Sequence, residues 1–151
     1  GIVVIGGGIA DGHSVARATM AGADLVYMGT RFIPTQESMA SPTYKQMLID
    51  ATAEDLVISS GITGTPASWL KPSLRAAGLD PDDLPPTPPR NYDSNRSFKQ
   101  RKWVDTWTAG QGVGAIKRIS PVAEVVNELE REFEAATRQW RRFGQLQMET
   151  A

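Results

Sequence analysis

The sequence of this 151-residue chain predicts an α/β fold that opens with a strand, a helix and a second strand. The β-branched run Ile2–Ile5 stops at three consecutive glycines, and such a continuous apolar run is typical of a parallel strand covered on both faces. Asp11 can cap a helix that Gly22 can end. The apolar run Leu25–Met28 then ends at another glycine. This order predicts a parallel strand pair with a right-handed crossover.

The middle of the chain predicts one more helix, one more strand and an irregular segment. Ser41-Pro42 combines an N-cap with proline at the first helical position. The apolar residues that follow at helical spacing are Tyr44, Met47, Leu48 and Ala51. Leu56–Ser59 predicts a short strand or an extended edge. The proline-rich stretch 77–101 predicts a long irregular excursion, and loops of that length are commonly functional covers or flexible segments.

The tail predicts a long helix that starts at Ser120-Pro121. Its apolar residues alternate at spacings of four and three: Val122, Val126, Leu129, Phe133, Ala136, Trp140 and Phe143. This heptad stripe is short for an independent coiled coil. We therefore favour packing against the helix's own domain, with a homodimer contact as the alternative.

Composition excludes several classes of function. The net charge is −1 and the basic group Lys99, Arg101 and Lys102 is short, which argues against nucleic acid as a partner. No apolar run approaches the ~20 residues needed to cross a bilayer, so no membrane partner is expected. The absence of cysteine excludes a disulfide framework, a thiolate zinc site and a cysteine nucleophile. A cytoplasmic location fits that usage, and no metal site is predicted.

The glycine-rich run Gly6–Gly12 lies where the first strand ends and the first helix begins. Backbone N–H groups are unpaired at such a point and the helix dipole adds positive charge, so the run is either an anion site or a plain tight turn. It does not match the dinucleotide pattern G-x-G-x-x-G, because Asp11 stands where glycine is needed. An ordinary P-loop is also disfavoured, because His13 replaces its lysine.

A second glycine site ends the next strand at Met28-Gly29-Thr30. Two consecutive strands therefore finish in glycine loops on the same edge. In a (β/α)8 barrel, the loops after strands seven and eight commonly form a phosphate site. Thr30 can donate both its N–H and its hydroxyl group, whereas Arg31 either adds charge or pairs with Glu37 or another neighbour.

The ordered series of motifs resembles the nitronate monooxygenase family, also called the 2-nitropropane dioxygenase-like flavin family. The matching segments are Gly7–Gly12, Gly22–Asp24, Met28–Phe32 and Glu37-Ser38. The later segment Trp107–Gly114 is similar to the family's C-terminal W-[ST]-A-G-Q-G-V-G motif.

This resemblance implies an FMN-dependent (β/α)8-barrel enzyme that oxidises alkyl nitronates with molecular oxygen, so its partners are a small-molecule substrate and O2. Residues 1–58 would form the last two βα units of the flavin-binding barrel. Residues 59–119 would be an irregular cover segment that carries the W-T-A-G-Q-G-V-G motif. Residues 120–147 would form a C-terminal helical extension. The chain is then expected to be the C-terminal portion of a longer protein and to be inactive alone.

The resemblance also implies which residues hold the cofactor. The FMN phosphate would be bound by Gly8 and by the segment Tyr27, Met28, Gly29 and Thr30, with Gly7 adjoining and Gln111 near the flavin side of the barrel mouth. No catalytic residue is predicted here, because the family's usual catalytic histidine comes from an earlier strand. His13 stands where relatives often carry arginine, and it does not inherit that role.

Two other functions stay open. One is an NAD(P)H-dependent flavin reductase that acts on quinones or on an enoyl thioester, and the other is a non-catalytic phosphate-ligand-binding module. The run Gly64–Ser68 reads G-T-P-A-S where many family members have a G-R-P-A-R-like run. This departure indicates that the mouth of the barrel differs from that of those members. It also leaves open whether the substrate is a nitronate.

Overall fold

The computed structural model describes residues 1–87 and 106–149, with the side chains of 143–149 left out. The basic group at 99–102, much of the predicted excursion and the side chain of Phe143 lie outside these described residues. Among the described residues, none of the helices combines the length and the apolar character needed to cross a bilayer.

The predicted βαβ unit is present, so the α/β class is confirmed. Strand β1 (Val4–Gly6) pairs in parallel with β2 (Leu25–Tyr27), with Val4 opposite Leu25, and helix α1 (Gly12–Met20) connects them. Both strands are shorter than their apolar runs. Each has only the other as a ladder partner among the described residues, and the ladder covers three residues of each strand.

The predicted cap of α1 is confirmed in atomic detail. Asp11 Oδ1 accepts from Ser14 N at 2.7 Å, and Ser14 Oγ accepts in return from Asp11 N at 3.2 Å. This reciprocal capping box satisfies two amide groups at the helix start. Burial alone would raise the pKa of Asp11, but the hydrogen bonds from Ser14 and the nearby Arg17 and His13 outweigh it and lower the pKa.

The middle of the chain forms a second packed unit. Helix α2 (Pro42–Asp50) begins after its predicted Ser41 cap, and β3 (Leu56–Ser59) spans the predicted strand. Between them lies a 3-10 turn, η2 (Ala53–Asp55). The structure adds β4 (Ala67–Leu70), antiparallel to β3, and α3 (Lys71–Ala76). Segment 59–119, expected to be irregular, therefore contains regular elements.

Two apolar clusters stabilise this second unit. One buries Leu48, Ala51, Leu70, Ala109 and Val113, and the other buries Ile62, Trp69 and Leu74. Trp69 and Leu70 are adjacent in β4 and point into different clusters, as alternation along a strand requires. The unpredicted strand β4 therefore lies between the two clusters.

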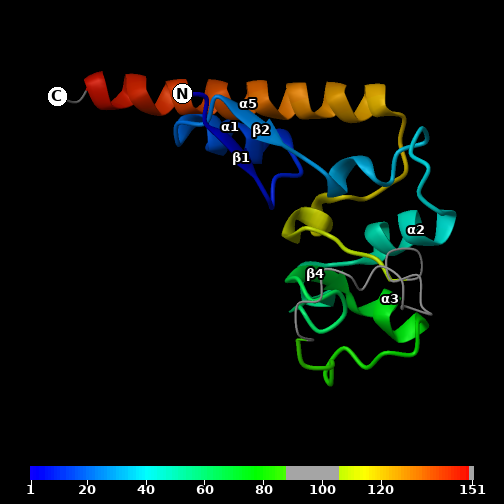
Figure 1. Cartoon of the computed structure of the whole chain (residues 1–151). Helices are drawn as coiled ribbons and strands as arrows, with labels where there is room; N and C mark the ends of the chain where they lie inside the picture. The colour runs from blue at the N-terminus through cyan, green and yellow to red at the C-terminus, as the bar shows by residue number, and fades with distance from the viewer. Residues whose placement is uncertain (88–105, 150–151) are drawn as a thin grey trace.

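Helix α5 (Val122–Glu149) packs along α1, as Figure 1 shows. This contact agrees with packing against the helix's own domain. The buried face differs by one residue from the predicted stripe, because Val125 is 1% exposed whereas Val126 is 47% exposed. Trp140 is 63% exposed, so the contact weakens toward the C-terminus of α5.

The α1–α5 contact depends on glycine at position 12. A Cβ on Gly12 would lie 2.1 Å from Leu129 O and 2.5 Å from Phe133 N, both backbone atoms of α5. Gly12→Ala should therefore force the helices apart and lower the free energy of unfolding by about 3 kcal/mol. Chemical denaturation of the protein that carries this chain measures the loss. Gly114→Ala is the control, because its Cβ meets nothing within 4 Å, and equal stability of the two variants would contradict the prediction.

Candidate functional site

The carboxyl ends of β1 and β2 meet a third segment, 110–112, around a pocket of about 150 Å³. The pocket is lined by Gly7, Gly8, Ile9, Ala10, Tyr27, Gly29, Thr30, Gly110 and Gly112. Five predicted site residues line it: Gly7, Gly8, Tyr27, Gly29 and Thr30. Met28 and Gln111 do not, and the Gln111 side chain is exposed.

The first wall is the loop after β1. Gly7 and Gly8 have φ angles of 93° and 69°, a left-handed region in which a side chain is strained. A Cβ on either residue would meet nothing within 4 Å. The missing side chains therefore leave open space that a ligand can enter.

The second wall is the turn after β2, where the 3-10 helix η1 (Thr30–Phe32) begins. Gly29 has a φ of −113°, so its conformation alone does not require glycine, and a Cβ there would again meet nothing within 4 Å. Thr30 Oγ1 accepts a hydrogen bond from Gly110 N at 2.8 Å. The second and third walls are therefore joined directly.

The third wall is the segment 110–112 of the motif Trp107–Gly114, at the start of the 3-10 helix η4 (Gln111–Ala115). Gly112 approaches the first loop so closely that a Cβ there would lie 2.6 Å from Ala10 Cβ and 3.0 Å from Gly8 O. The prediction chose Gln111 from this motif and missed its two neighbouring glycines. The glycines on both sides of Gln111 could have indicated this contact, because glycine commonly marks a position where two backbones approach closely.

This third wall is positioned by β4 and α2. Ala109 N donates to Ser68 O at 3.1 Å, and Leu70 N donates to Trp107 O at 2.9 Å, so residues 107–109 extend the β3–β4 sheet. The ring of Tyr44 stacks on Trp107 with centroids 4.9 Å apart, and its hydroxyl donates to Thr108 O at 2.5 Å.

Backbone amides supply the pocket's polar groups. Within the described part of the chain, the N–H groups of Gly8, Gly29 and Thr30 have no acceptor. Unpaired amides that converge on one small space form a binding site for an anion. These two loops therefore retain unpaired amide groups beside the pocket, as an anion site would require, and the anion site itself stays a prediction.

The N-terminus of α1 contributes less than its sequence suggested. Gly12 N donates to the Glu132 carboxylate at 2.7 Å, and Ser14 N donates to Asp11. Two carboxylates of the protein thus occupy the amides at which an anion was expected. The unpaired N–H donor on this side of the pocket is therefore that of Gly8 in the loop after β1, and not one at the N-terminus of α1.

Arg31 does not add charge to the pocket. It is 7% exposed and pairs with Glu128 of α5 at 2.7 Å, with Arg118 at 3.5 Å from the same carboxylate. The alternative of an ion pair is confirmed, with Glu128 rather than Glu37 as the partner. Glu37 instead accepts from Val122 N at the start of α5.

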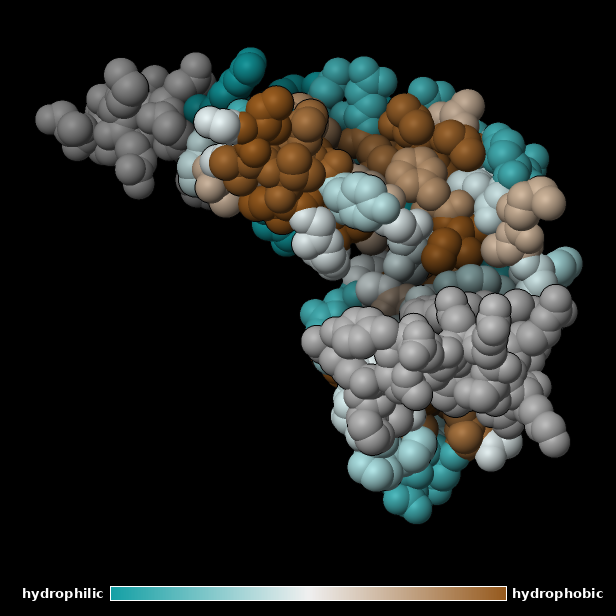
Figure 2. All heavy atoms as spheres, viewed as in Figure 1, coloured by the Kyte–Doolittle hydropathy of each residue, from teal (hydrophilic) through white to brown (hydrophobic). Residues whose placement is uncertain are grey.

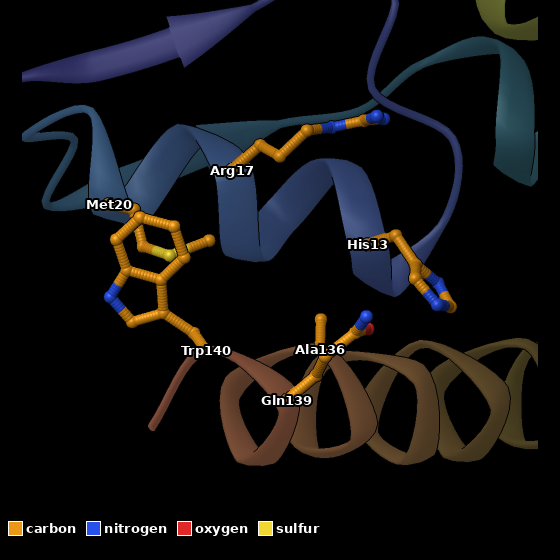
Figure 3. Close-up of a pocket in the computed structure, with 6 residues that line it drawn as sticks. All are labelled: His13, Arg17, Met20, Ala136, Gln139 and Trp140. Atoms are coloured by element: carbon orange, nitrogen blue, oxygen red, sulfur yellow. The ribbon is translucent and has the colours of Figure 1, made fainter. Parts of the chain in front are cut away.

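His13 lies in a separate groove between α1 and α5, shown in Figure 3. This groove is lined by His13, Arg17, Met20, Ala136, Gln139 and Trp140, none of which lines the glycine pocket. The placement agrees with a histidine that takes no part in chemistry at that pocket.

Comparison with known proteins gives matches to nitronate monooxygenases over most of the chain. The family model described as "Nitronate monooxygenase" matches residues 2–80. A nitronate monooxygenase of Paraburkholderia phytofirmans is 32% identical over 149 residues, which cover 94% of this chain and 40% of that protein. One of Pseudomonas aeruginosa is 31% identical over 136 residues, which cover 84% of this chain and 38% of that protein.

Two solved structures are also similar to this chain in three dimensions. FabK of Thermotoga maritima superposes with a TM-score of 0.68 at 28% identity, covering 94% of this chain and 47% of that one. A nitroalkane oxidase of Streptomyces ansochromogenes superposes with a TM-score of 0.63 at 23% identity, covering 92% of this chain and 41% of that one. At that identity the second match shows the fold alone. The chain spans less than half the length of each of these relatives.

The Tyr44 contact that positions the third wall is testable through pH. Burial raises the pKa of Tyr44 above its ordinary value of 10.0. The stabilisation is therefore complete below pH 10 and is lost as the pH rises through the raised pKa, because the phenolate cannot donate.

Tyr44→Phe keeps the ring stack and should lower the free energy of unfolding by about 1 kcal/mol at neutral pH. The difference from wild type should shrink at alkaline pH. Denaturant titrations of both proteins at several pH values measure this gap. A gap that stays constant or widens at high pH would contradict the assignment.

Proposed function

Because this chain belongs to the nitronate monooxygenase family, we propose that it supplies the cofactor-phosphate site of an FMN-dependent oxidoreductase acting on alkyl nitronates with O2. The observation that carries the proposal is the glycine pocket. Its free amides and missing Cβ atoms come from the two strand ends that the family resemblance assigns to the flavin phosphate.

The residues of this pocket fit a phosphate monoester. A phosphate presents three strong acceptor oxygens, and Gly8, Gly29 and Thr30 offer amide donors without protein partners. A cavity of about 150 Å³ has room for this group but not for a whole flavin. The rest of the cofactor would therefore extend out of the pocket.

The other predicted cofactor residues keep different roles in this proposal. Gly7 shapes the first loop, and Tyr27, at 72% exposure, lines the pocket. Met28 and Gln111 lie outside the pocket lining, so we assign them to the part of the flavin beyond the phosphate.

The βαβ unit fits the last two βα units of a (β/α)8 barrel. Figure 2 shows apolar side chains gathered over β1 and β2. On or beside these two strands, Ile2 is 75% exposed, Val4 56% and Leu25 57%. In a closed barrel, further strands pair with both edges and other parts of the protein cover such side chains. We propose that residues 1–58 occupy that place, with 59–119 as a cover and α5 as the helical extension.

The flavin would supply the redox chemistry, accepting electrons from the substrate and passing them to O2. The residues of this chain bind and orient it. No described side chain of the pocket is a carboxylate or a histidine that could remove a proton from carbon. We therefore place the base outside this pocket, and the family resemblance implies an earlier strand as its source.

A second candidate is an NAD(P)H-dependent flavin reductase that acts on a quinone or an enoyl thioester, and the similarity to FabK favours it. Oxygen uptake with propionate 3-nitronate, compared with NADH oxidation by a quinone, separates the two activities. The non-catalytic alternative predicts a protein that binds no flavin. A purified protein that is colourless once it has been incubated with FMN and the unbound FMN removed would therefore support that alternative.

Gly29→Ala tests the phosphate site with little strain. The added methyl group meets no protein atom within 4 Å but would occupy the space of the ligand. We expect FMN affinity to fall by about tenfold to a hundredfold, because overpacking typically costs about 1–3 kcal/mol. Quenching of FMN fluorescence on binding measures it, while thermal stability without FMN should hold. Gly114→Ala is the control outside the pocket, and wild-type FMN affinity in Gly29→Ala would overturn the site.

A further inference from the structure

Helix α5 contacts the elements that follow both strand-end loops. Glu132 accepts from Gly12 N at 2.7 Å, at the first residue of α1. Glu128 accepts from Arg31 Nη2, also at 2.7 Å, within the 3-10 turn η1. Residues four apart lie on the same face of a helix, so one face of α5 holds both elements. None of the described residues that line the glycine pocket belongs to α5, so the helix acts on the pocket from behind.

Arg31 connects α5 to the second wall of the pocket. It follows Thr30 directly, and Thr30 lines the pocket whereas Arg31 does not. The turn η1 contains only three residues, so a side chain held in its middle fixes where the turn lies. The Arg31–Glu128 ion pair therefore helps to fix the position of the Thr30 N–H group.

The burial of this ion pair indicates a role in geometry more than in stability. Arg31 is 7% exposed, and the Glu128 side chain is 24% exposed, so both charges lose much of their hydration. This loss of hydration commonly offsets the attraction between buried charges, and well-packed apolar residues in their place often stabilise a fold equally well. The best-attested use of such a pair is to select one arrangement of the elements that it joins.

We propose that Arg31 and Glu128 are positioning residues for the cofactor phosphate. The pair holds the Thr30 amide where it can bind the same phosphate group as the Gly8 amide. Glu132 supports the first wall in the same way, because Gly12 begins the helix into which the Gly8 loop leads. The inference rests on the proposed function, because it concerns the phosphate site assigned there, and it makes α5 a determinant of cofactor affinity.

Arg31→Met tests the pair without leaving a buried charge alone, because Glu128 keeps Arg118 at 3.5 Å. Quenching of flavin fluorescence gives the affinities of the protein that carries this chain for FMN and for riboflavin, the same flavin without its phosphate. We expect FMN to bind about fivefold or more weakly, the lower end of the usual range for coupling between two sites. Riboflavin should bind as to wild type, because it makes no phosphate contact. General damage to the fold would weaken both flavins alike.

Three further variants sharpen the comparison. Arg138→Met is the matched control, because it breaks an exposed ion pair with Glu134 on the same helix, and it should leave both affinities unchanged. Arg31→Lys keeps the positive charge and should lose less FMN affinity than Arg31→Met. Glu128→Gln keeps the shape of the side chain and should selectively weaken FMN binding, so it carries the same test if Arg31→Met does not fold.

Two results would overturn the proposal. One is wild-type FMN affinity in both Arg31→Met and Glu128→Gln. The other is an equal loss of affinity for FMN and for riboflavin, which would assign the pair to the stability of the fold alone. A wild-type protein that binds FMN no more tightly than riboflavin would instead refute the phosphate site of the proposed function itself.

Discussion

The close approach of the 110–112 turn to the loop after β1 determines the rest of the site. It brings together segments about a hundred residues apart, and it requires glycine at position 112, where a Cβ would lie 2.6 Å from Ala10 Cβ. The bond from Gly110 N to Thr30 Oγ1 ties the same turn to the end of β2. Without this approach the two strand ends would form an open edge rather than a pocket.

Contacts on two sides support this arrangement. Helix α5 binds behind both strand-end loops through carboxylates one turn apart, Glu132 on Gly12 N and Glu128 on Arg31. On the other side, the ladder between β4 and residues 107–109 and the Tyr44 stack fix the course of the chain into the turn. The pocket thus receives its shape from regular elements and its donors from loops, as is common for binding sites.

Sequence reasoning succeeded where structure is decided locally. The caps at Asp11 and Ser41 and the strand–helix–strand order depend on neighbouring residues, and each is present. It failed where distant residues decide. The four residues of β4 form a strand because β3 and residues 107–109 flank them, and the Gly12 amide at the N-terminus of α1 is occupied by Glu132, 120 residues away. The roles of Gly110 and Gly112 likewise depend on partners that no local pattern reveals.

The central claim is that the two strand ends and the 110–112 turn together hold the phosphate of FMN. The crystal structure of the FMN-loaded protein tests it most directly. We predict phosphate oxygens at about 3 Å from the backbone nitrogens of Gly8, Gly29 and Thr30, the usual length of an N–H···O hydrogen bond. A phosphate bound elsewhere, with these amides facing solvent, would contradict it.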